Sequence, residues 1–122
     1  MRFRRSHLVV AALVLTATGC GASATRIAVP GGNPGRGEQL VGSFGCGSCH
    51  TIAGIKGADG EIGPSLVDFA DRRLIAGRIP NTLPNLLRWL ENPQAVEPGT
   101  VMPDLGVEAP QARDLAAYLY AH

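Results

Sequence analysis

Two cysteines and a histidine stand together in the segment Cys46-Gly47-Ser48-Cys49-His50. The pattern Cys-x-x-Cys-His is the signature of covalent c-type haem attachment. Two thiols three positions apart in a tight helical turn can reach the two vinyl groups on one edge of a porphyrin. The adjacent His50 then points at the iron, and the small residues Gly47 and Ser48 let the backbone lie against the ring. The motif therefore predicts one covalently bound haem c.

Three other chemistries use a similar pair of cysteines. A dithiol redox centre needs a βαβ context, which the surrounding sequence does not show. A zinc site needs further cysteine or histidine ligands, and after residue 20 the sequence adds only the terminal His122. A disulfide between Cys46 and Cys49 would close a short, strained ring. Haem attachment is therefore the interpretation that the motif favours.

A second iron ligand is predicted at Met102, in the segment 99–103. The glycine and proline in this segment indicate an extended loop, which is a poor place for a core methionine. A methionine that fills a gap under a loop is the structural alternative. A thioether opposite a histidine raises the potential of haem iron and fills both axial positions, which suits electron transfer. His122 is a competing ligand candidate, but it lies at a terminus, where chains fray.

Helices joined by long loops must position these residues. Asn33-Pro34 begins the first predicted helix, because proline is tolerated in a first turn. Thr82 caps the second, which Asn92-Pro93 ends, and Pro110 opens the last. A shorter helical turn is expected near residues 65–70, and no segment alternates as a strand does. Apolar residues follow helical spacing in each main helix: Leu40, Val41 and Phe44; Leu83, Leu86, Leu87 and Leu90; Ala112, Leu115, Ala116 and Leu119. The predicted fold class is all-α, with three main helices and a short one.

A haem would complete a core that the protein alone fills poorly. Aromatic residues make up 5% of the 122-residue chain, and a domain this small usually needs a disulfide, metal or cofactor. We therefore expect the haem-free chain to be largely unfolded. The net charge of +1, without a basic stripe, argues against nucleic acid as a partner. Five leucines are candidates for the lining of the haem pocket: Leu66, Leu83, Leu86, Leu87 and Leu105.

The N-terminal residues predict export. Arginines before residue 8, a short apolar run and small residues before Cys20 are typical of an export signal, and the run is too short to span a bilayer. Small residues directly before a cysteine resemble a bacterial lipoprotein signal, in which Cys20 is lipidated and becomes the mature N-terminus. Cleavage after Ala24, which would release a soluble periplasmic protein, and an uncleaved hydrophobic anchor are the alternatives.

The predicted organisation is a signal peptide over residues 1–19, a flexible tether over 20–33 and a single domain over 34–122. Residues 1–19 hold three of the eleven basic residues and no acidic one, so their removal changes the net charge from +1 to −2.

Over residues 36–121 the chain resembles class I cytochromes c. It is most similar to the cytochrome c domain of caa-type haem–copper oxidase subunit II. The resemblance rests on Trp89 and on the segments 45–52, 63–66, 71–77, 80–82, 92–94, 98–99 and 102–103. That subunit also carries a transmembrane hairpin and a dinuclear copper domain, which have no counterpart in this sequence. We therefore expect a free-standing relative of its haem module.

The resemblance implies further roles. The carbonyl of Pro64 would accept a hydrogen bond from the His50 ring, and Arg72 and Trp89 would contact haem propionates. A solvated charge is the alternative for Arg72, and a plain core position is the alternative for Trp89. Gly37 matches the small residue at which the N- and C-terminal helices of the family cross, and it would face Leu115 and Tyr118.

The predicted function is that of a monohaem electron carrier in an extracytoplasmic respiratory chain, lipid-anchored at the outer face of a bacterial membrane. The protein itself would not be an enzyme. Its partners would be a terminal oxidase, a cytochrome bc complex or a dehydrogenase. Two alternatives stay open: a haem-based sensor of small ligands, with a labile or absent second ligand, and an electron-transfer subunit of an oxidase or dehydrogenase complex.

Overall fold

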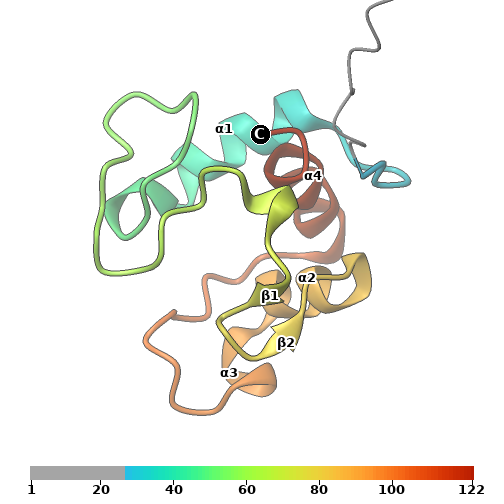
Figure 1. Cartoon of the computed structure of the whole chain (residues 1–122). Coiled ribbons are helices and arrows are strands. Elements are labelled where there is room, and N and C mark those ends of the chain that lie inside the picture. Colours follow the sequence, from blue (N-terminus) through green and yellow to red (C-terminus); the bar gives the residue numbers. More distant parts are fainter. Residues whose placement is uncertain (1–26) are drawn as a thin grey trace, which may run out of the picture.

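The structure, a computed structural model, describes residues 27–122. Its helices are α1 (Pro34–Ser43), α2 (Leu83–Glu91), α3 (Pro93–Val96) and α4 (Ala109–Leu119), which confirms the predicted helical class. Figure 1 shows α1 and α4 packed together, with α2 and α3 below them and long loops to the left. No helix among these residues is long and apolar enough to cross a membrane.

Helices α1 and α2 begin at the positions that the sequence predicts. The Asn33 side chain accepts a hydrogen bond from the Arg36 backbone N–H at 2.9 Å, directly before α1. Thr82 caps α2 in the same way. Asn92 ends α2 and also caps the single-turn helix α3, which was not predicted from the sequence. Each of these helices has a proline in its first turn, where the missing N–H is harmless.

Helices α1 and α4 cross at Gly37, as expected from the resemblance. A Cβ atom at this position would lie 2.7 Å from the Tyr118 Cβ and would also clash with the Asp114 carbonyl oxygen. Leu115 lines the central cavity. The absence of a side chain at Gly37 therefore allows the two helix backbones to touch.

A charged cluster stabilises the same crossing. The Arg36 guanidinium donates to both carboxylate oxygens of Asp114, with Nε at 2.7 Å and Nη2 at 2.9 Å. The Asn33 backbone N–H donates to Asp114 Oδ1 at 2.7 Å. The hydrogen bonds from Arg36 are the main reason that the pKa of Asp114 is lowered, although burial opposes them. This carboxylate is therefore ionised and fully paired at neutral pH.

A small hairpin corrects the expectation that the chain has no strands. Strand β1 (Leu74–Ile75) pairs antiparallel with β2 (Ile79–Pro80). Three residues, 76–78, connect the paired Ile75 and Ile79. Ala76 and Gly77 both lie in the left-handed region, at φ 51° and φ 71°, and the Arg78 N–H donates to the Ile75 carbonyl at 3.0 Å. Positive φ at both central residues is what a type I′ turn requires. Strands of two residues are too short to show an alternating pattern, so periodicity could not reveal them.

The segment before the hairpin contains a 3₁₀ turn over Phe69–Asp71, slightly later than the short helical turn expected near residues 65–70. Asn81 holds this segment, because its Nδ2 donates to the carbonyls of Phe69 and Arg72, each at 3.0 Å. The Tyr120 hydroxyl in turn donates to Asn81 Oδ1 at 2.9 Å. The end of α4 and the hairpin are thereby tied together on one side of the cavity.

Candidate haem-binding site

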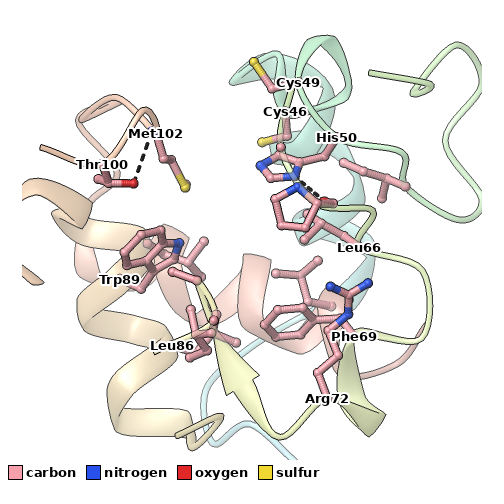
Figure 2. Close-up of a pocket in the computed structure, with 18 of the residues that line it drawn as sticks. Cys46, Cys49, His50, Leu66, Phe69, Arg72, Leu86, Trp89, Thr100 and Met102 are labelled. Atoms are coloured by element: carbon pink, nitrogen blue, oxygen red, sulfur yellow. Dashed lines mark hydrogen bonds between the residues drawn. The ribbon is translucent and has the colours of Figure 1, made fainter. Parts of the chain in front are cut away.

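A central cavity of about 690 Å³ lies between α2, the hairpin, the Cys46–His50 motif and the 100–103 loop. Its volume falls in the range of cofactor and ligand pockets. Most side chains that line it are apolar; within residues 27–122, the charged ones are Arg72 and Arg73, and no acidic side chain lines it. Figure 2 shows His50 with both cysteines on one side of this cavity and Met102 on the opposite side.

The two cysteines follow a sharp turn at Gly45, which has φ 68°. Cys46 begins a 3₁₀ turn that spaces the two thiols along one wall of the cavity, and both are free thiols in the described part of the chain. Burial raises the pKa of the Cys46 thiol, since it faces apolar surroundings. The wall therefore presents two free thiols next to a histidine.

The small size of Gly47 also allows a close contact with the loop that follows the motif. A Cβ atom at Gly47 would lie 2.7 Å from the Cβ of Ala58, in the loop that follows the motif. The Gly47 carbonyl also accepts a hydrogen bond from the Gly60 N–H at 3.1 Å. Gly47 thus lets this loop pack onto the motif.

The His50 ring is held in one orientation. Its Nδ1 lies 2.7 Å from the Pro64 carbonyl oxygen. A carbonyl oxygen can only accept a hydrogen bond, so Nδ1 carries the proton and the lone pair of Nε2 is free to bind a metal. Gly63 lies against the ring, and a Cβ there would come within 2.6 Å of Nδ1. The backbone of residues 63–64 therefore fixes both the tautomer and the position of the predicted ligand.

Met102 lies in an extended loop, as the sequence predicts, and its side chain lines the cavity. The Met102 N–H donates to Thr100 Oγ1 at 3.4 Å, the bond drawn at the left of Figure 2. The competing candidate, His122, is not among the lining residues: its ring stacks on Tyr118 at 4.4 Å and its Nδ1 lies 3.0 Å from the Tyr118 carbonyl oxygen. The structure thus brings together His50 and Met102, and it places His122 elsewhere.

Arg72 and Trp89 both line the cavity. The Arg72 side chain is half-buried, and its Nη2 donates to the Val67 carbonyl at 3.4 Å. Trp89 is buried, with 8% of its surface exposed, so it belongs to the core and to the cavity wall at once. Arg73, which the sequence analysis did not assign a role, is a second cation at this wall. Because these two arginines line the cavity and no acidic side chain of residues 27–122 does, the cavity favours a ligand that carries carboxylates.

The leucine lining differs from the prediction. Leu66 and Leu86 line the cavity, as expected. Leu83, Leu87 and Leu105 instead pack, partly buried, against the protein core. Positions 86, 89 and 90 share the face of α2 that points at the cavity, so residues 83 and 87 fall to the side of it.

These residues fit a covalently attached haem. Thiols suit bonds to the vinyl groups, the apolar walls suit the porphyrin faces, and the arginines suit the propionates. His50 and Met102 lie on opposite sides of the cavity, and a ring nitrogen and a thioether sulfur are the kinds of ligand that haem iron takes.

Comparisons with known proteins agree with this fit. The family model "Cytochrome c" matches residues 35–121. A cytochrome c oxidase subunit 2 of Alkalihalophilus pseudofirmus is 36% identical over 87 residues, which are 69% of this chain and 24% of that protein. A protein of the same name from Bacillus sp. strain PS3 is 37% identical over 59 residues, which are 47% of this chain and 17% of that protein.

The chain thus corresponds to about a quarter or less of each relative's length. No solved structure matches significantly. The resemblance to the cytochrome c region of oxidase subunit II is confirmed. The chain therefore belongs to the cytochrome c family, its cofactor is covalently bound haem c, and its chemistry is electron transfer.

Proposed function

We propose that the protein is a monohaem electron carrier in which His50 and Met102 are the two axial ligands of the iron. The observation that carries this proposal is the placement of these two side chains on opposite sides of one apolar cavity. The bound haem supplies a metal that gains or loses one electron. The protein excludes water from it and offers one ligand on each side.

The two ligand side chains have different roles. The Pro64 carbonyl makes His50 a stronger electron donor, since it accepts the Nδ1 proton at 2.7 Å. The Met102 thioether favours the reduced state and raises the potential. With His50 and Met102 both bound to the iron, no position would stay open for oxygen or another small ligand. This supports a carrier over a haem-based sensor.

Arg72 and Trp89 are proposed to hold the propionates, with Arg73 as a neighbouring charge. Cationic partners lower the energetic cost of placing two carboxylates at the edge of an apolar cavity. Trp89 provides a rigid wall, since most of its surface is buried.

The proposed cellular setting is the outer face of a bacterial membrane. Cys20 lies outside the described residues, and its lipidation rests on the sequence pattern before it. The relatives named cytochrome c oxidase subunit 2 support a terminal oxidase as the partner. A cytochrome bc complex or a dehydrogenase would supply the electrons. Membrane fractionation, with mass spectrometry of the mature N-terminus, tests the anchor: cleavage after Ala24 would contradict it.

Protein-film voltammetry of the haem-loaded protein tests the carrier function. We expect a reversible one-electron wave and no binding of carbon monoxide by the reduced protein at micromolar concentrations. A slow or irreversible wave, together with ready binding of carbon monoxide, would favour the sensor and contradict the proposal.

A further inference from the structure

The side-chain amide of Gln94 binds the loop that carries Met102. Its Nε2 donates to the Thr100 carbonyl at 2.7 Å and to the Met102 carbonyl at 2.9 Å. Its Oε1 accepts from the Gly99 N–H at 3.3 Å. One exposed side chain therefore makes three hydrogen bonds to a four-residue stretch of backbone.

The base of this side chain is itself fixed. Pro93, the preceding residue, is among the most deeply buried side chains of the protein, and Asn92 caps the single turn of α3 with a hydrogen bond of 2.9 Å to Ala95. The loop is also tied at its start, where Glu97 pairs with Arg78 of the hairpin at 3.2 Å. Gln94 thus connects a fixed helical turn to the end of the loop that faces the cavity.

The chemistry of the three bonds requires a primary amide. Two carbonyls need two donated hydrogens and one backbone N–H needs an acceptor, which is what a glutamine side chain offers. A glutamate at this position would keep the acceptor but would place a carboxylate against two carbonyl oxygens. A leucine would keep the approximate size and lose all three bonds.

We propose that Gln94 is a positioning residue that keeps Met102 on the iron and thereby sets how readily an external ligand can replace the methionine. The inference rests on the proposed function, in which Met102 is an axial ligand. With the loop held, the thioether stays within reach of the metal. Without it, the loop samples conformations in which the iron is open.

Competition with imidazole measures this opening directly. An external ligand binds the open form, so its apparent affinity rises in proportion to the open fraction. Loss of two hydrogen bonds corresponds to roughly a tenfold larger open fraction or more. We expect Gln94→Leu and Gln94→Glu to bind imidazole, in the ferric haem-loaded protein, about tenfold more tightly than the wild type. Gln39→Leu, on the exposed surface of α1 away from the central cavity, is the matched control and should match the wild type.

Hydrogen exchange gives a second reading on the same samples. The amide of Gly99 should exchange faster in Gln94→Leu, which removes its acceptor. The amide of Met102 should exchange faster in both variants because the loop is released, while the amides of α1 and α4 should be unchanged. A side chain that only adds global stability would change the unfolding midpoint but not the imidazole affinity under native conditions.

Two outcomes separate this inference from the proposed function. If Met102→Ala raises the imidazole affinity strongly and both Gln94 variants bind like the wild type, the positioning role of Gln94 is wrong while the ligand role of Met102 stands. If Met102→Ala leaves the imidazole affinity and the ferric spectrum unchanged, the ligand role itself is wrong.

Discussion

Replacing Gly63 with alanine tests whether the His50 ring is held by the backbone beside it. The new Cβ would clash with His50 Cε1 and would lie 2.6 Å from Nδ1, whereas ordinary contacts begin at 3.4 Å. The ring or the 63–64 backbone must therefore move by more than about 0.8 Å. Gly63 does not have a positive φ, so the backbone itself accepts alanine and the cost is steric.

The expected magnitude follows from overpacking in a closely packed site, which costs about 1–3 kcal/mol. Urea unfolding of the haem-loaded protein should show this loss in the free energy of unfolding. The shift also stretches the bond of 2.7 Å from Nδ1 to the Pro64 carbonyl. Since that bond makes the imidazole a stronger donor to the metal, its weakening should raise the reduction potential.

Gly42→Ala is the matched control for this change. Within residues 27–122, no atom beyond the chain neighbours of Gly42 and the nearby backbone of α1 lies within 4 Å of a Cβ built there, and Gly42 is the second-last residue of the helix. Alanine there should stabilise the protein by about 0.5–1 kcal/mol, because glycine weakens a helix, and should leave the potential unchanged. If Gly63→Ala proved as stable as Gly42→Ala and kept the wild-type potential, the contact between Gly63 and the ring would have no energetic role.

Three further predictions concern the fold. Gly37→Ala should force α1 and α4 apart and lower the free energy of unfolding by about 2 kcal/mol or more. Thermal unfolding of the haem-loaded protein measures this loss, and an unchanged midpoint would contradict the close contact of the two helices at Gly37. The pKa of Asp114 is lowered in the folded protein, so its pairing with Arg36 stabilises the protein fully at a pH above the ordinary aspartate pKa of about 3.9. This stabilisation is lost as the pH falls through the lower pKa of the folded state. In Asp114→Asn, the free energy of unfolding should therefore depend less steeply on pH in this acid range, and a dependence as steep as that of the wild type would contradict the prediction. A Cys46→Ser/Cys49→Ser variant that retained native far-ultraviolet circular dichroism without haem would show that the cofactor is not needed to complete the core.

Local sequence signals were sufficient to predict the main helices and the centre of the site. The starts of α1 and α2 could be predicted at Asn33 and Thr82 because the first turn of a helix depends on residues that are neighbours in the sequence. The spacing of Cys46, Cys49 and His50 follows from the geometry of one porphyrin edge, so it identifies the cofactor without a structure.

Contacts between distant residues could not be predicted in this way. The short hairpin depends on Ala76 adopting a left-handed conformation that its residue type does not favour. Too many leucines of α2 were predicted to line the cavity. Periodicity shows which leucines share one side of a helix, but it does not show which of them point at the cavity. Gln94 appeared only as part of the resemblance, and its bonds to the Met102 loop join residues five to eight positions apart with no local motif.

X-ray absorption at the iron edge of the purified haem-loaded protein tests the central claim most directly. The account predicts one sulfur and five nitrogen neighbours in both oxidation states, with the sulfur lost in Met102→Ala. A second imidazole, an oxygen neighbour or a five-coordinate iron in the wild-type protein would contradict the assignment of His50 and Met102 as the axial pair.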